Sequence, residues 1–357
     1  MIAAPLGTAF LVSFFPKEKL RLAFLITLIA MFLMSLVSLR WVFTYLTSGP
    51  VDYYTAGTLP PFSINFRMAL PEACLVLLIN LTGLFSTLFL KNSLLRMGRL
   101  SMAVLLIDIM SLSGIVLTRD VFNLFVFLEL MAISTGGLVL LSEDNRAPTA
   151  GLKYLIVSQL VTILLLIGII FAYHATGTLN IDGLTVASLT HSTGGKLAFF
   201  LILIAVIAEV KPFPANGWAL DIYESAHPSF SVIFSVASSS AVLFSTAKIL
   251  SIAGPEWLPI ASHVGIITFL AANLFALSQT NDRRLLGYSS LGQSGLVLAI
   301  IGQQDILGDH YLYVAGEGAI DWKDFGRTER PGPEPPDGRR RRRRGRPPPG
   351  VEARGRA

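Results

Sequence analysis

The segment RDVFNLFVFLELMAISTGGLVLL, residues 119–141, is apolar over a length that can cross a membrane, yet it carries Glu129 near its middle. About 20 apolar residues span a hydrocarbon core of roughly 30 Å. A carboxylate at that depth costs roughly 2.5–3.5 kcal/mol on insertion scales, and such groups usually face a partner or a transport path. Glu129 is therefore the first candidate functional residue.

The composition of the whole chain also indicates a protein that lies in a lipid membrane. Of its 357 residues 53% are hydrophobic and only 14% are charged, and the mean hydropathy is +0.63. Soluble domains carry about 25% charged residues. Cys74 is the only cysteine, which excludes an internal disulfide. No paired histidines at haem-ligand spacing and no Gly-rich phosphate loop occur, so we expect no cofactor in this chain and no nucleic-acid partner.

The apolar runs predict an all-α polytopic membrane protein with about ten transmembrane helices. Helices are expected because backbone polar groups in lipid must be satisfied within each segment. The expected spans are 2–15, 21–46, 70–90, 100–118, 121–142, 154–174, 196–210, 229–253, 262–279 and 285–303.

Basic residues alternate between loops and predict the orientation. Lys and Arg follow the first, third, fifth and ninth spans, whereas loops 47–66, 175–195 and 254–261 contain none. Basic loops remain cytoplasmic, so the N-terminus is expected outside. Arg119 is the exception, with Asp120 beside it.

The C-terminal segment differs from the rest of the chain. Residues 317–357 hold 12 Lys and Arg against 7 Asp and Glu, which equals the net charge of +5 of the whole chain. The run from Arg339 to Arg344 fits either an arm for anionic lipid or nucleic acid or a disordered, frameshifted terminus, and we favour the second. We divide the chain into N-terminal helices with an external loop (1–65), a core (66–313) and a tail (314–357).

A second feature is a predicted break in the seventh span, AEVKPFPANGWALDIYESAHP (208–228). Its prolines and Asn-Gly pair cannot continue a regular helix, and a broken helix at membrane depth must be buried or line a cavity. Glu209 and Lys211 lie at the break and point to different sides. We expect Lys211 to pair with Glu129.

Other charged residues in or near the spans have weaker cases. Lys248 lies near the end of the eighth span and is a further candidate, and Asp108 is deep in the fourth span without a partner that the sequence identifies. Glu72 and Lys153 lie near span ends, where side chains reach the interface, so we expect a structural role for both. Polar groups also join helices without further function, which is the competing interpretation throughout.

Several motifs together resemble a known family. LTRDVFNLFVFLELMAIST (117–135), GLKYLIVSQL (151–160) with YHATGTLNI (173–181), PANGWALDIYESAHPSFS (214–231) and NDRRLLGYSSLGQSGLVL (281–298) occur in this order. The set, covering residues 66–313, is similar to the antiporter-like membrane subunits. These occur in respiratory complex I, multisubunit sodium/proton antiporters and energy-converting hydrogenases.

The resemblance implies about fourteen helices in two inverted repeats, each with a broken helix, and a Glu/Lys proton relay at mid-membrane. Glu129 matches the acidic residue of the family. Counted from Trp218, the relay lysine falls on Glu209, with Lys211 two residues later. The next relay lysine falls on Ser240, with Lys248 two turns on, and Gln293 stands where a histidine is frequent. The second repeat is expected to be truncated.

These observations predict a multi-pass protein of a prokaryotic inner membrane that moves H⁺ or Na⁺ through Glu129, Lys211 or Glu209, and Lys248. It would be a non-catalytic subunit beside other membrane and redox subunits of an NADH:quinone oxidoreductase-like, hydrogenase-like or antiporter complex. Two alternatives are a degenerate, non-conducting subunit and a stand-alone secondary cation/proton transporter.

Overall fold

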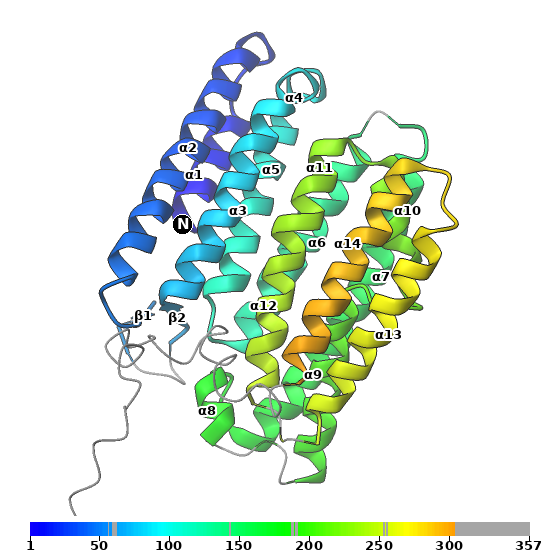
Figure 1. Ribbon diagram of the computed structural model, residues 1–357. Coiled ribbons are helices and arrows are strands. Elements are labelled where there is room, and N and C mark those ends of the chain that lie inside the picture. Colours follow the sequence, from blue (N-terminus) through cyan, green and yellow to red (C-terminus); the bar gives the residue numbers. More distant parts are fainter. Residues whose placement is uncertain are drawn as a thin grey trace, which may run out of the picture. The chain divides into compact units, whose positions relative to one another are not determined.

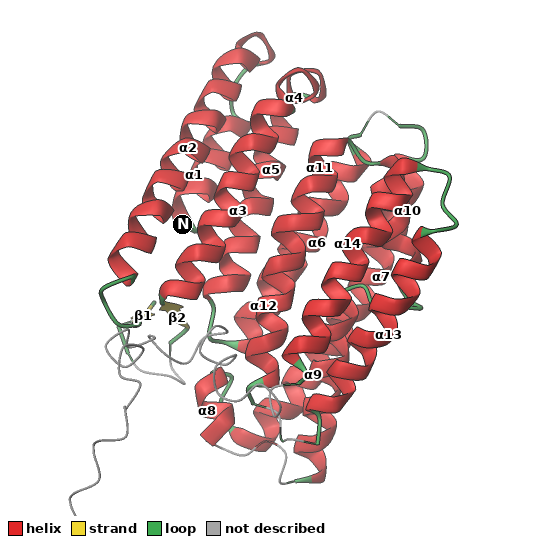
Figure 2. Cartoon of the chain, in the orientation of Figure 1, coloured by secondary structure: helices red, strands yellow, loops and turns green. Residues whose placement is uncertain are grey.

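The computed structural model describes residues 1–303 except 56, 59–62, 143, 187–188, 190–191, 253 and 255. The described part is almost entirely helical (Figure 2). The tail expected at 314–357, and the end of the core expected at 66–313, lie outside the described residues. Among the described residues the elements are α1 (Ala3–Ser13), η1 (Lys17–Lys19), α2 (Leu20–Tyr45), β1 (Val51–Tyr54), β2 (Asn65–Met68), α3 (Leu70–Phe89), α4 (Lys91–Met97), α5 (Arg99–Leu117), α6 (Val121–Leu140), α7 (Ala147–Thr176), α8 (Ile181–Val186), α9 (Thr193–Glu209), α10 (Gly217–Ser225), α11 (Pro228–Val232), η3 (Ile233–Ser238), α12 (Ser239–Leu250), α13 (Leu258–Ala276) and α14 (Asp282–Ile301).

Each of the ten expected spans coincides with a helix, so the prediction of an all-α membrane fold is confirmed. Seven of the described helical segments are by themselves long and apolar enough to cross a bilayer, one of them the continuous run 228–250 of α11, η3 and α12. The others are α1, which has 11 residues, α9, which has 17, and α14, which is less apolar. The largest boundary error is at α7, which begins at Ala147 rather than at residue 154.

Side-chain caps fix where several helices begin. The carboxylate of Asp120 accepts a 2.7 Å hydrogen bond from the Asn123 amide at the start of α6. Ser192 caps α9 and Asn281 caps α14 in the same way. Each cap satisfies amides that have no partner within the helix, so the spans start at defined positions.

The two ends of the bundle differ in composition. The basic turns before α2, around α4, before α7 and before α14 all lie at the upper end in Figure 1. The hairpin of β1 and β2, the short α8 and the α12–α13 turn lie at the opposite end. The hairpin, antiparallel with Val51 opposite Met68, falls in a stretch expected to be only a loop. The sequence therefore separates the ends correctly but misses the strands.

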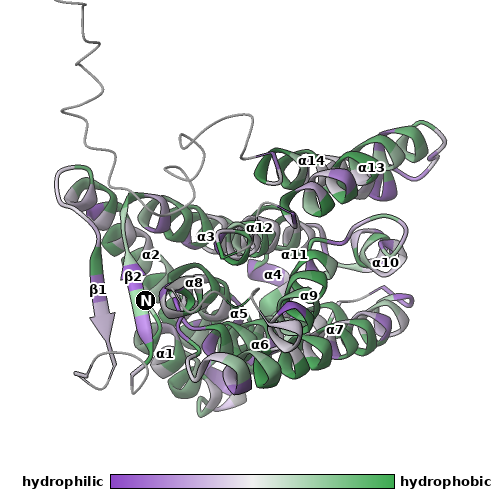
Figure 3. Cartoon of the chain, turned by 90° about the horizontal axis from the view of Figure 1, so that it is seen from below, coloured by the Kyte–Doolittle hydropathy of each residue, from purple (hydrophilic) through white to green (hydrophobic). Residues whose placement is uncertain are grey.

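Helix α5 forms the centre of the bundle, since 83% of its membrane-spanning window is buried. It packs against α1, α3 and α6 and, at its far end, against α12. Seen along the bundle, α5 lies inside the other helices, whereas α13 and α14 form a pair at one edge (Figure 3).

The α13–α14 pair depends on glycines at the helix contact. A Cβ built on Gly265 would lie 2.6 Å from the Gly295 carbonyl oxygen, and one on Gly295 would lie 2.8 Å from the Phe269 nitrogen. Small residues allow such close approach in membranes. We predict that Gly265→Ala lowers the free energy of unfolding by about 1–3 kcal/mol, the usual effect of overpacking. Thermal denaturation of the detergent-solubilised protein measures this.

The matched control is Gly292→Ala in the same helix pair, where the atoms nearest to the added Cβ belong to the side chains of Asn273 and Ala272, at 3.0 Å or more. Its denaturation temperature should stay close to that of the wild type. Equal losses in the two variants would contradict the prediction.

Candidate functional site

The predicted break in the seventh span is present. Helix α9 ends at Glu209 and α10 begins at Gly217. Between them Lys211 has a φ of +66°, in the left-handed region. Non-glycine residues rarely adopt this conformation, and here it lies directly after the end of α9.

Glu209 and Lys211 are both buried, with exposed fractions of 3% and 4%, and they contact different helices. The Ser158 hydroxyl of α7 donates a 3.0 Å hydrogen bond to the Glu209 carboxylate. The Lys211 ammonium donates to the Ser239 hydroxyl at 3.1 Å and to the Phe234 carbonyl at 3.4 Å. It also lies 3.6 Å from the centroid of the Phe234 ring. The two charges thus face α7 and α12 respectively.

Glu129 and Lys211 do not form the ion pair expected from the sequence. The half-buried Glu129 carboxylate instead accepts a 2.6 Å hydrogen bond from the Gln159 side chain of α7. Gln159 is the neighbour of Ser158, which binds Glu209, and Glu129 is close enough to Glu209 to act on it electrostatically. Helix α7 therefore links the two carboxylates.

These contacts define a mid-membrane line that crosses four helical elements. We use this name for Glu129, Gln159, Ser158, Glu209, Lys211 and Ser239. A line of alternating carboxylates, hydroxyls and an ammonium can hold and exchange protons where apolar side chains cannot. Among the sequence-predicted candidates it brings together Glu129, Glu209 and Lys211.

The π-helical segment η3 supplies one end of this line. Its wider turn disturbs the regular helical bonding. The Phe234 carbonyl accepts hydrogen bonds from Lys211 and from the Ser239 hydroxyl, the latter at 3.2 Å. The same backbone irregularity therefore provides an acceptor for a buried ammonium.

A groove of about 590 Å³ adjoins Ser239 and runs between the α11–α12 segment and α14. Seven serines and Gln293 line it, and Arg283 lies at its basic-loop end. Both positions at which the chain departs from the family pattern, Ser240 and Gln293, face this groove. The serines are Ser231, Ser235, Ser239, Ser240, Ser289, Ser290 and Ser294.

Lys248 lies apart from the mid-membrane line. Its ammonium donates three hydrogen bonds, to the carbonyls of Ile115, Val116 and Thr118 at 2.8–2.9 Å. These groups are at the C-terminal end of α5, where carbonyls lack helical partners and a cation is favoured. Lys248 is therefore placed as the cap of α5.

Asp108, for which the sequence indicated no partner, has two. Its carboxylate accepts hydrogen bonds from the Ser134 and Thr135 hydroxyls of α6 at 2.7 and 2.9 Å. The side chain is 1% exposed. These contacts join α5 to α6 in the manner expected of polar groups that hold membrane helices together.

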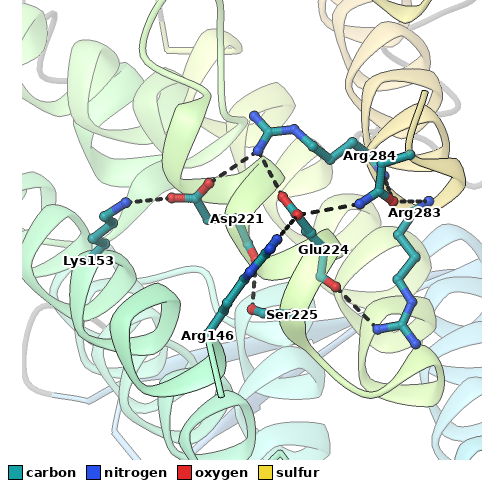
Figure 4. A network of polar contacts seen from close by, with 8 residues as sticks. Arg146, Lys153, Asp221, Glu224, Ser225, Arg283 and Arg284 are labelled. Atoms are coloured by element: carbon teal, nitrogen blue, oxygen red, sulfur yellow. Dashed lines mark hydrogen bonds and ion pairs between the residues drawn. The ribbon is translucent and has the colours of Figure 1, made fainter. Parts of the chain in front are cut away.

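Charged residues also fasten the broken helix at the basic end. Asp221 and Glu224 of α10 bind Lys153 of α7 and Arg284 of α14, and Arg146 also pairs with Glu224 (Figure 4). The Lys153 ammonium lies 2.8 Å from Asp221, and its side chain is 57% exposed, as expected for a residue near a span end. This network holds α7, α10 and α14 together around the break.

Sequence reasoning missed Ser158 and Gln159. The available signal was the adjacent pair of polar residues in an otherwise apolar span. It also assigned Glu72 to the membrane interface, whereas Glu72 is fully buried, with an exposed fraction of 0%. Arg119 and Lys248, both distant in the sequence, lie close enough to act on Glu72 electrostatically, so its local position gave no warning.

Comparison with solved structures agrees with this architecture. A chain of the membrane-bound sulfane sulfur reductase, an archaeal respiratory membrane complex, superposes with a TM-score of 0.78 and is 26% identical, over 88% of this chain and 67% of the other. A chain of the Mrp complex from Dietzia sp. also gives a TM-score of 0.78 and shares the fold at 24% identity, over 84% and 57% of the two chains.

Sequence relatives point in the same direction. NADH-quinone oxidoreductase subunit N of Rubrobacter xylanophilus is 29% identical over 247 residues, which are 67% of this chain and 50% of the relative. Subunit N of Rhodospirillum rubrum is 30% identical over 229 residues, 61% and 46% of the two chains. The chain spans about half the length of the curated relatives it matches.

The family described as NADH:quinone oxidoreductase/Mrp antiporter, transmembrane, matches residues 118–314. This range is more than half of the chain and contains Glu129, the break after α9 and the α14 motif. The resemblance inferred from the motifs is confirmed, and the chain belongs to the NADH:quinone oxidoreductase/Mrp antiporter transmembrane family.

Proposed function

We propose that this chain is the proton-translocating membrane subunit of a multisubunit complex of the NADH:quinone oxidoreductase type, in a prokaryotic inner membrane. The observation that supports this best is the mid-membrane line, in which Gln159 and Ser158 of α7 bind Glu129 and Glu209, and Lys211, two residues after Glu209, binds Ser239. Charged side chains are costly at this depth in a membrane span, and they usually mark a transport path or face a partner.

In the proposed mechanism Glu129 takes up a proton and passes it towards Glu209. Gln159 and Ser158 lie between the carboxylates on one helix, and the Ser158 hydroxyl can donate to Glu209 while accepting from another donor. Protonation of Glu209 removes the negative charge near Lys211, whose ammonium then more readily releases its own proton. The proton released by Lys211 moves through Ser239 towards the end of the membrane at which Lys248 lies. The proton on Glu209 then passes to the neutral Lys211, which restores both groups.

The groove beside Ser239 is proposed to connect the line with the basic-loop end. Hydroxyl groups offer both donors and acceptors, so the seven serines can bind water among the apolar side chains, such as Val236 and Leu243, that also line the groove. By the alternation of basic loops this end is cytoplasmic and the N-terminus is outside. Water in the groove would then give the neutral Lys211 a second route to reprotonation, from the cytoplasm, besides the route from Glu209.

The position of Glu129 also supports a partner subunit. Glu129 is half-buried, on the same stripe of α6 as Phe122 and Ile133, which are 44% and 58% exposed. A carboxylate left against lipid is costly. We infer that a neighbouring membrane subunit covers this stripe and that redox subunits of the complex supply the driving energy.

The second candidate function is ion exchange in a multisubunit sodium/proton antiporter. The Mrp complex from Dietzia sp. contains a chain of the same fold, which favours this alternative over an isolated transporter. The degenerate subunit considered above would retain the fold and lose transport.

Glu129→Gln tests the proposal. Inverted membrane vesicles that contain the complex receive NADH, and proton uptake is followed by the quenching of a pH-sensitive dye. We expect uptake to fall about threefold, an increase in barrier of about 0.7 kcal/mol, because the amide cannot carry the proton and only slower routes to Glu209 remain. The amount of assembled complex should not change.

Glu18→Gln is the control, since this exposed carboxylate at the basic end removes one charge outside the line. If Glu129→Gln assembles normally and takes up protons at the rate of the control, the proposal is contradicted and the degenerate, non-conducting subunit is favoured. If the vesicles take up no protons when NADH is added but acidify in response to a sodium gradient, the result would favour the antiporter.

A further inference from the structure

A second group of charged residues, three of them buried and three half-buried, lies at the end opposite the basic loops. It comprises Glu72, Lys248, Arg119, Arg67, Asp52 and Asp182, and we call it the outer cluster. These residues come from β1 and β2, the start of α3, the turn after α5, α8 and the end of α12, which gather at the lower end in Figure 1.

Glu72 is the unusual member of the outer cluster. Its side chain is fully buried, and neither carboxylate oxygen has a hydrogen-bond partner among the described residues. An ionised carboxylate in such a place needs paired charge or donors. Lys248, Arg119 and Arg67 act on it electrostatically but make no ion pair with it within the described structure.

The cations around Glu72 are held in place by other partners. Arg119 is 2% exposed and pairs with Asp182, and Arg67 contacts both Asp52, at 3.0 Å, and Asp182, at 3.3 Å. The Nε of Arg119 has no partner among the described atoms. Asp120, beside Arg119, is used as the cap of α6. These positive charges therefore cannot move freely to follow Glu72.

Of the cations around Glu72, Lys248 is held by the largest number of hydrogen bonds to backbone carbonyls. An ammonium has three N–H donors and a neutral amine has two. All three donors of Lys248 are used by the α5 carbonyls. Loss of the proton would leave a buried carbonyl without its hydrogen bond, which is unfavourable. The three acceptors therefore favour the charged form of Lys248 and hold its ammonium in place.

The charge count then leaves one variable group. Arg67, Arg119 and Lys248 give three positive charges, whereas Asp52 and Asp182 give two negative ones. With Glu72 ionised the outer cluster is neutral, and with Glu72 protonated it carries one positive charge. Because the other members are fixed in ion pairs or hydrogen bonds, Glu72 is the member whose protonation can change at least cost.

Backbone contacts hold residues 118–120, the segment that contains Arg119. The Arg119 amide donates to the Asn65 carbonyl of β2, and the Ile181 amide donates to the Arg119 carbonyl, both at 2.9 Å. Phe66 bridges to Thr118 and Asp120 bridges to Asn180. Residues 118–120 thus form a strap between the hairpin and α8, and this strap carries Arg119 of the outer cluster.

We propose that Glu72 is a proton-carrying residue at the outer end of the translocation path, with Lys248 and Arg119 as the fixed charges that favour proton release from it. In one cycle the Glu72 carboxylate accepts a proton that arrives from the mid-membrane line. The resulting carboxylic acid then gives that proton to water at the outer end and returns to the carboxylate. This inference rests on the proposed function.

The test compares Glu72→Gln with Glu129→Gln and with Glu256→Gln, an exposed carboxylate at the same end, in vesicles containing the whole complex. We expect Glu72→Gln to assemble normally and to take up protons about threefold more slowly than Glu256→Gln. Uptake equal to that of Glu256→Gln, while Glu129→Gln is slow, overturns the role of Glu72 and leaves the proposed function intact. Control-level uptake in both variants overturns both.

If Glu72→Gln does not assemble, Glu72→Asp provides the test, because it retains a titratable group with a shorter side chain. If Glu72 carries protons, the pH profile of uptake in Glu72→Asp is displaced from that of the wild type. If Glu72 is only a permanent counter-charge, an assembled Glu72→Asp complex has the wild-type profile, and that result overturns the proposal.

Discussion

Replacing Glu209 with glutamine is expected to reduce proton translocation at least about tenfold, a rise in the barrier of about 1.4 kcal/mol, while the complex still assembles. Glu209 is 3% exposed and is the only carboxylate of the mid-membrane line that lies at the helix break. Glutamine has nearly the same shape and keeps the hydrogen bond with Ser158, but it cannot be protonated and released in turn.

The effect at Glu209 should exceed that at Glu129 because the two sites differ in access. Glu129 is half-buried, so water or a neighbouring group can bypass it, whereas Glu209 is enclosed between α7 and the break. Proton uptake by vesicles at equal complex content measures both. A Glu209→Gln rate equal to that of Glu18→Gln would show that Glu209 is a structural hydrogen-bond acceptor.

Replacing Lys211 with glycine is expected to have an effect of similar size. The variant removes the buried ammonium from Ser239 and Phe234. Glycine adopts a positive φ without strain, so the backbone at the break is preserved or even favoured. The expected loss, at least about tenfold in proton uptake, therefore reports the charge rather than the backbone.

Lys211→Arg and Lys211→Met complete this comparison. Arginine keeps a positive charge but remains protonated under all ordinary conditions, so it should also fail to relay protons. Methionine fills the space with an apolar chain and should behave as glycine does. Normal uptake in Lys211→Arg would indicate that Lys211 supplies only a fixed charge near Glu209.

The spans and the break could be predicted from sequence because both depend on local properties. A bilayer requires about 20 apolar residues for each helix. Pro212, Pro214 and the Asn216–Gly217 pair end α9 whatever helices surround it, because they cannot continue a regular helix. Family motifs then placed Glu129, Glu209 and Lys211 in one region. The structure brings these three together in the mid-membrane line.

The partners of these residues could not be predicted, because they depend on which helix lies between others. Helical spacing gives the face on which Glu129 lies, but not that α7 stands between it and the break with Gln159 and Ser158. For the same reason the expected pair of Glu129 and Lys211 was wrong. Glu72 was misjudged because it is fully buried close to Arg119 and Lys248, which are distant in the sequence.

The central claim is that Glu209 and Lys211 carry protons across the middle of the membrane. It is tested most directly by the initial rate of NADH-driven proton uptake in vesicles with matched amounts of complex, measured for Glu209→Gln, Lys211→Gly and the control Glu18→Gln. Rates in the first two variants at or below about one tenth of the control are predicted. Rates equal to the control in both variants would contradict the account.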